Sequence, residues 1–354
     1  MKEDLNKNEC ILGVDTHLDI HVGAIINNTG KVAGTKTVSS NNSGFNELFD
    51  WASSFGTVME AGIEGTGTYG ASLCDYLQDK NIHVFEVNRP DRSKRRLEGK
   101  SDPIDAISAA RSVWSGTATA IPKSHNGICE ALRIISIARK SAVKSKTQTI
   151  NQLRALLVSA PQKIREKLWQ VKPHECVSAC LKYRNVVTNS TVLSTLLSIL
   201  KSLAKRWLLL KQEVDLLDKE MDKLTKEHTP RLRSRLGVGP QTAATLLSVA
   251  GDNPERLKSE ASLAALCGVN PLPASSGKTI RHRLNRGGNR TANNAIWTVA
   301  MVRMRSEPRT KSYVERRTAE GLSQKEICRC LKRYIVRELY PVILDDLSKI
   351  KLIT

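Results

Sequence analysis

Short apolar runs alternate with polar turns over the first hundred residues of the chain. Runs bounded by turn residues predict β-strands, and they cover residues 11–15, 20–26, 31–38, 58–64 and 83–87. Amphipathic stretches predict helices over residues 41–55 and 69–80, and a third helix that opens at Asp102. Three strands, followed by helices that alternate with strands, are the order of a mixed sheet. We therefore predict the α/β fold class for this part.

Beyond residue 126 the apolar spacing becomes that of helices. Long helices are predicted over residues 128–160 and 191–228, and apolar residues of the second recur in alternating threes and fours, which is typical of a coiled coil. Such helices pair two subunits or fold back on each other within one chain, and both interpretations stay open. Shorter helices are predicted further on, over residues 292–305 and 321–340. We divide the chain into three parts: 1–125, 126–228 and 229–354.

Charge narrows the class of partner. The 354 residues include 55 Lys and Arg against 35 Asp and Glu, a formal net charge of +20, which favours a polyanion and above all nucleic acid. Because only 4% of the residues are aromatic, we expect contact through the phosphate backbone rather than base stacking. No apolar run reaches the roughly 18 residues that span a bilayer, and the N-terminus has no signal-peptide core. We expect a cytoplasmic protein without a membrane partner.

Four acidic residues stand at the ends of predicted elements. Asp15 and Glu64 each end a strand, while Asp102 and Asp105, three residues apart, share one face of the first turn of a helix. Ligands of open α/β sheets bind beyond the carboxyl ends of the strands, so we expect the four carboxylates to converge. Such a group suits two divalent cations about 4 Å apart that clamp a phosphodiester. The alternatives are solvated strand-end or N-cap residues, and Glu60 in place of Glu64.

Two basic segments are candidates for nucleic-acid contact. The first lies just before the acidic helix, where it either holds a backbone near the cations or is a solvated loop; its candidate residues are Arg92, Lys94, Arg95, Arg96 and Lys100. The second follows a Ser-Ser-Gly turn and can neutralise phosphates; its candidate residues are Lys278, Arg281, Arg283, Arg286 and Arg290. Residues 236–243 resemble the hairpin of a helix-hairpin-helix element, or form a plain turn between helices.

A glycine motif supports a rival hypothesis. Gly65-x-Gly67-x-x-Gly70 follows a predicted strand and opens a helix, and Glu86 comes about twenty residues later, as in the fingerprint of dinucleotide-binding sites. This motif favours a NAD-dependent oxidoreductase. Two observations count against it: Glu64 would place negative charge beside a pyrophosphate, and the positive excess of the chain would have no purpose.

Three segments resemble a known family. Gly13-Val14-Asp15, the run from Ile63 to Gly70 and the run from Lys100 to Ala106 are similar to motifs of the RuvC-like (RNase H-like) domain of DEDD transposases, the insertion-sequence family numbered one hundred and ten. Residues 230–340 resemble the C-terminal domain of the same transposases. The resemblance implies a RuvC-like domain, a coiled-coil region that dimerises, and a mainly helical C-terminal domain.

The resemblance also implies a reaction. The four acids would bind Mg²⁺, or Mn²⁺ in its place, and Ser276, or its neighbour Ser275, would attack DNA to give a 5′-phosphoserine link and a free 3′-hydroxyl. The implied partners are donor and target DNA, a structured guide (bridge) RNA, and further copies of the chain in a homodimer or homotetramer that unites the acids with the serine. Besides the NAD-dependent oxidoreductase, two alternatives remain: a RuvC-like nuclease of the Holliday-junction resolvase type, which hydrolyses with water, and a non-catalytic nucleic-acid-binding protein.

Overall fold

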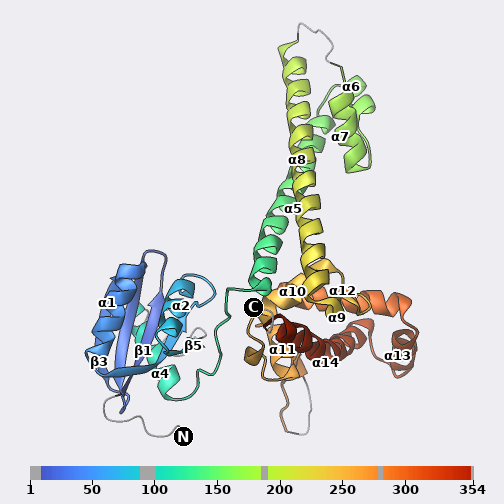
Figure 1. Cartoon of the computed structure of the whole chain (residues 1–354). Coiled ribbons are helices and arrows are strands. Elements are labelled where there is room, and N and C mark those ends of the chain that lie inside the picture. The colour runs from blue at the N-terminus through green and yellow to red at the C-terminus, as the bar shows by residue number, and fades with distance from the viewer. Residues whose placement is uncertain (1–8, 88–100, 185–189, 278–281, 352–354) are drawn as a thin grey trace. The chain divides into compact units, whose positions relative to one another are not determined.

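The computed structural model describes residues 9–87, 101–184, 190–277 and 282–351 of the chain (Figure 1). By the packing of its residues the chain divides into two compact units. The first unit comprises Met1–Asn126 together with Gly251–Arg256, and the second comprises Gly127–Ala250 together with Leu257–Thr354. The division into three parts that we made from the sequence stays a prediction.

The first unit is built on a five-stranded mixed sheet. Its strands are β1 (Glu9–Thr16), β2 (Ile20–Asn27), β3 (Val32–Ser39), β4 (Thr57–Glu64) and β5 (His83–Val87). The spatial order is β3-β2-β1-β4-β5. Strands β1, β2 and β3 pair antiparallel, whereas β4 runs parallel to both β1 and β5. The predicted mixed α/β sheet is thereby confirmed.

Helices cover both faces of this sheet. They are α1 (Asn42–Ser53), α2 (Ala71–Asp79) and α4 (Asp102–Trp114). Leu12 and Val14 of β1 point into the core that the sheet shares with α1 and α2, where Leu48 and Leu73 are buried. Ile11, on the opposite face of the same strand, belongs to the core under α4. Since neighbouring strand residues face opposite ways, the odd-numbered residues of β1 face α4.

Two long helices dominate the second unit. They are α5 (Ile128–Val158) and α8 (Thr191–His228), which pack side by side and run in opposite directions (Figure 1). The intervening chain forms α6 (Gln162–Leu168) and α7 (Pro173–Lys182). All four helices share a core that includes Leu153 and Trp207. The two long helices therefore fold back on each other within one chain, which is one of the two interpretations that the sequence left open.

Shorter elements complete the second unit. They are the helices α9 (Pro230–Arg233), α10 (Pro240–Ala250), α11 (Glu260–Leu266), α12 (Arg290–Ser306), α13 (Pro308–Ala319) and α14 (Gln324–Lys351), with β6 (Pro271–Pro273) paired antiparallel to β7 (His282–Leu284). The helices share one core with the first turns of α5 and the end of α8. The mainly helical C-terminal region is as predicted. Among the described residues, no helix has the length and apolar character to cross a bilayer.

Glycine in the turn between α9 and α10 suits both the backbone conformation and the close packing there. Gly237 has φ +86°, a conformation that favours glycine, and a Cβ atom there would lie 3.2 Å from Val299 of α12. The helix before this turn, α9, has only 4 residues. The turn that we compared with a helix-hairpin-helix element thus packs against a neighbouring helix.

Candidate active site

Two glycines let α4 lie directly against the sheet. A Cβ atom on Gly13 of β1 would lie 2.1 Å from the carbonyl oxygen of Ala106 and 2.3 Å from the backbone nitrogen of Ala110, both in α4. A Cβ atom on Gly62 of β4 would lie 2.8 Å from the carbonyl oxygen of Ala109. Only glycine fits where two backbones come this close. Both glycines therefore lie on the face of the sheet that α4 covers.

Asp15 and Glu64 follow these glycines by two residues. Because alternate residues of a strand share a face, both acids lie on the same side as α4. Val14 pairs with Ile63 in the parallel ladder, so the two acids stand next to each other at the carboxyl ends of β1 and β4. The hydroxyl of Thr16 donates a hydrogen bond of 2.7 Å to the carbonyl oxygen of Glu64, which holds the two strand ends together.

The first turn of α4 supplies two further acids. Ser101 stands before the helix in an extended conformation, and a proline follows Asp102 in the first turn, as the sequence pattern predicts. Asp105 is buried at 6% exposure, whereas the side chain of Asp102 is 42% exposed. At the other end of the helix, the Trp114 indole N–H donates to the carbonyl oxygen of Asn28 in the β2–β3 turn. This contact and the two glycines fix α4 on the sheet.

The charges of these acids act on one another. Burial raises the pKa of the Asp15 carboxyl above its usual value, the nearby His17 lowers it, and the negative charges of Asp105 and Asp102 raise it further. The net effect is a raised pKa of Asp15, because burial and the two neighbouring acids disfavour its ionised form more than His17 favours it. A bound divalent cation would favour the ionised form.

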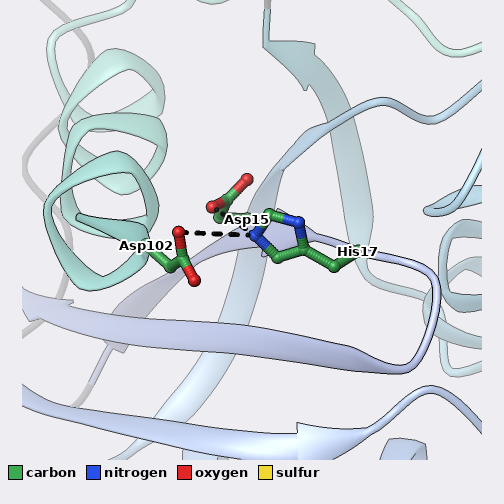
Figure 2. Close-up of side chains that lie close together, drawn as sticks. All are labelled: Asp15, His17 and Asp102. Atoms are coloured by element: carbon green, nitrogen blue, oxygen red, sulfur yellow. Dashed lines mark hydrogen bonds and ion pairs between the residues drawn. The ribbon is translucent and has the colours of Figure 1, made fainter. Parts of the chain in front are cut away.

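His17 completes a group of three potential metal ligands (Figure 2). Its Nε2 atom lies 3.2 Å from Oδ2 of Asp15 and 3.5 Å from Oδ1 of Asp102. The sequence analysis treated His17 only as part of a turn. An available signal was the Asp-x-His spacing at the end of β1, because residues two apart on an extended chain share a face.

The donor set fits a divalent cation. One ligand atom each from Asp15, His17 and Asp102 can be chosen so that all lie within 4.8 Å of one another. Carboxylate oxygens suit Mg²⁺, and carboxylates combined with an imidazole also suit Mn²⁺. Asp105 and Glu64 are not part of this group of three. Asp105 nevertheless acts electrostatically on Asp15, and Glu64 ends the neighbouring strand.

The predicted serine and part of its basic surroundings belong to the second unit. Ser275 and Ser276 follow β6 and are both exposed, and Gly277 turns the chain with φ +55°. Three predicted nucleic-acid contacts are exposed on β7 and on the chain up to the start of α12: Arg283, Arg286 and Arg290. The other predicted contacts lie outside the described residues: Arg92, Lys94, Arg95, Arg96, Lys100, Lys278 and Arg281.

The acid that a dinucleotide site would need beside the glycine motif is already paired with an arginine. Its loop does lead from β4 into α2, as that hypothesis expected. Glu86, however, forms an ion pair of 3.6 Å with Arg256, and its backbone N–H donates to the carbonyl oxygen of Ala120. An acid that is occupied by an arginine is poorly suited to bind a ribose. The geometry therefore does not favour the oxidoreductase hypothesis.

Comparisons with known proteins agree with this geometry. Residues 12–160 match the profile of a family described as transposase, the DEDD transposases of IS110 type, and residues 229–315 match that of the transposase IS116/IS110/IS902 family. The chain is also 24% identical to the insertion element IS110 uncharacterized 43.6 kDa protein of Streptomyces coelicolor, over 94% of each chain. The first match contains all four acids and the second contains both serines. The chain belongs to the IS110 family of DEDD transposases, enzymes that cleave and rejoin DNA.

Proposed function

We propose that this transposase uses Asp15, Glu64, Asp102 and Asp105 to hold divalent cations and Ser276 to attack the DNA strand. The observation that carries the proposal is the burial of Asp15 against the charges of Asp102 and Asp105, at the carboxyl end of β1. Neighbouring carboxylates repel one another when they are ionised, and a bound cation would offset that repulsion. Glu64 shares their face of the sheet by strand register.

The cation would be Mg²⁺ or Mn²⁺. Asp15 and Asp102 would bind it directly, with His17 as a third donor, and Asp105 and Glu64 would complete the negative site. When bound, such a cation polarises a scissile phosphate and stabilises the leaving oxygen. The residues themselves orient the site, because the close packing of α4 on β1 sets the positions of the acids relative to one another.

Ser276 supplies the nucleophile in this proposal. Its Oγ atom attacks the phosphorus, the bond from phosphorus to the 3′-oxygen breaks, and the serine proton leaves the hydroxyl while the 3′-oxygen gains one. The products are a 5′-phosphoserine link and a free 3′-hydroxyl. Rejoining is the reverse attack by a 3′-hydroxyl. The exposed position of Ser276 supports the proposal, as do the exposed cations Arg283, Arg286 and Arg290, which can neutralise phosphate charge. Ser275 is the alternative nucleophile.

Other partners follow from the family and the charge. We infer that the chain acts on donor and target DNA as a homodimer or homotetramer, and that a structured guide RNA directs it. The net charge of +20 supports binding of more than one polyanion.

A trapped covalent adduct tests the proposal. The full chain is incubated with its DNA and Mg²⁺, digested with protease and nuclease, and analysed by mass spectrometry. A nucleotide on Ser276, absent from Ser276→Ala and retained in Ser275→Ala, is the expected result. Strand cleavage that persists in Ser276→Ala would instead identify a hydrolytic nuclease. Cleavage that is unaffected by Asp102→Asn would exclude the acids from catalysis, and binding without any cleavage would indicate a non-catalytic protein.

A further inference from the structure

Two cavities of the second unit meet at one tyrosine of α14. The first has a volume of about 1090 Å³ and lies among α12, α13 and α14. The second, of about 550 Å³, lies between α14 and the β6–β7 hairpin. Tyr334 and Arg337 line both cavities. Neither residue belongs to the site described above.

Arginine is the most frequent residue in the lining of the first cavity. Five arginines and two glutamates contribute to it: Arg235, Arg303, Arg309, Arg316, Arg337, Glu307 and Glu338. Arg303 is buried and serves the fold, since it bonds the Glu338 carboxylate and the carbonyl oxygen of Leu236. The other four arginines are exposed. The cavity therefore presents net positive charge to solvent and suits an anionic ligand.

The second cavity continues this positive surface towards the serine hairpin. Arg333 and Lys332 are held by Glu260 and by the side-chain oxygen of Asn293, respectively. Arg329 and Arg283 are exposed instead. Arg283 lies on β7, and the loop between β6 and β7 carries the proposed nucleophile. A chain of phosphates that crosses both cavities would therefore lead to this loop.

Tyr334 offers an aromatic surface between the two cavities. It is 54% exposed, its ring meets that of Tyr313 edge-on at 6.0 Å, and the Arg337 guanidinium lies 6.0 Å from its centre. Tyr340 on the same helix is different, because its hydroxyl donates to the carbonyl oxygen of Leu257 and so serves the fold. An exposed ring between two cavities that are both lined by arginines is a combination that binds single-stranded nucleic acid, in which bases stack and phosphates pair with cations.

We propose that Tyr334 is the stacking platform for an unpaired DNA strand beside the cleavage point. One base lies on the ring, and phosphates on either side contact Arg309 in the first cavity and Arg283 and Arg329 in the second. A duplex does not fit this role because its base faces are covered. The assignment to DNA rather than RNA rests on the proposed function, since the second cavity adjoins the loop of Ser276. Low aromatic content does not conflict with the proposal, because one exposed ring is sufficient.

Photo-cross-linking tests the contact directly. The full chain is mixed, in EDTA and about 0.2 M salt, with a DNA strand of about 15 nucleotides that carries 5-iodouracil, then irradiated and mapped by mass spectrometry. We expect the cross-link on Tyr334, its loss in Tyr334→Ala and its retention in Tyr334→Phe. Cross-links that map elsewhere in the wild-type chain would overturn the proposal.

Binding measured by fluorescence anisotropy supplies the magnitude. Tyr334→Ala should weaken single-strand binding about 10-fold, while Tyr334→Phe stays near the wild type. Arg309→Gln should reduce the slope of log affinity against log salt by about one, more than the matched control Arg206→Gln on the exposed side of α8. Equal effects of the two arginine variants, or a Tyr334 effect as large on duplex DNA, would contradict the proposal.

Two further arms separate this inference from the proposed function. An RNA strand of the same length should bind with less dependence on Tyr334 than DNA; a greater dependence would overturn the assignment to DNA. Ser276→Ala should bind the strand like the wild type. If no adduct forms on Ser276 while the Tyr334 cross-link persists, the serine chemistry fails and the strand site stands. If the adduct forms without the cross-link, the strand site fails alone.

Discussion

Replacing Gly13 by alanine tests the packing that brings the acids together. The added Cβ atom would lie 2.1 Å from the carbonyl oxygen of Ala106, 2.3 Å from the nitrogen of Ala110 and 2.7 Å from its Cβ atom. Two of these three atoms are backbone, so no rotation of a side chain relieves the contact and α4 must move. Overpacking of a core costs typically about 1–3 kcal/mol, and a collision with backbone belongs at the upper end.

The measurement is thermal unfolding of the full chain in EDTA, followed by hydrogen exchange of α4. A loss of about 3 kcal/mol should lower the melting temperature of the first unit by about 10 °C, and amides of α4 should exchange faster. Gly67→Ala is the matched control, because nothing lies within 4 Å of the Cβ atom it would add. The control should melt within about 2 °C of the wild type.

A double variant sharpens this test. Ala110→Gly removes the side-chain contact from the Gly13→Ala protein but leaves the two backbone contacts, so it should not restore the melting temperature. Full restoration by Ala110→Gly, or equal melting of Gly13→Ala and Gly67→Ala, would falsify the claim that backbone contact fixes α4 on β1. Divalent-cation affinity should fall in Gly13→Ala as well, because the acids of α4 move with the helix.

Three further results are expected. His17→Ala should weaken Mn²⁺ binding by about 10-fold or more, measured by electron paramagnetic resonance of free Mn²⁺, whereas replacing the exposed His83 at the start of β5 by alanine should not. Glu338→Gln should lower the free energy of unfolding at pH 7 by about 2 kcal/mol, measured as a lower melting temperature, because it leaves buried Arg303 without its carboxylate. The Arg303 hydrogen bond lowers the pKa of Glu338 from 4.5, so this stabilisation is present above about pH 4.5 and should disappear as the pH falls through the lowered value; a difference that persists at pH 2 would contradict the pairing.

The sheet and the long helices could be predicted because local pattern and final burial agree there. Strands of the first unit have apolar residues wherever the sheet is covered, and α8 keeps its apolar period without Gly or Pro. The last helix shows where local rules fail. Pro341 lies inside α14, yet Val342, Ile343 and Leu347 continue the apolar period into the core and carry the helix to Lys351. Tertiary burial outweighs the cost of the proline.

A helix with almost no apolar face could not be predicted. α13, Pro308–Ala319, buries only Thr310 among its residues, and its sequence is mostly polar and charged. Its partly buried Tyr313 and Val314 pack against the core of the second unit. Periodicity detects a helix by its apolar stripe, so a helix held by two side chains gives too weak a signal.

The candidate site also combines features that local sequence predicts with features that depend on distant packing. The acids were predictable because strand ends and a first helical turn are positions that local sequence defines. How close the strand acids lie to those of α4 depends on Gly13 and Gly62, against which the backbone of α4 packs about a hundred and about fifty residues further on. Amino-acid composition likewise does not show which side chains are exposed. Of the two tyrosines in α14, Tyr340 donates a hydrogen bond to the backbone, whereas Tyr334 is exposed to solvent. A count of aromatic residues treats the two alike, although only the exposed ring can take a base. A low aromatic fraction therefore limits how many stacking sites a chain can have, and does not decide whether it has one.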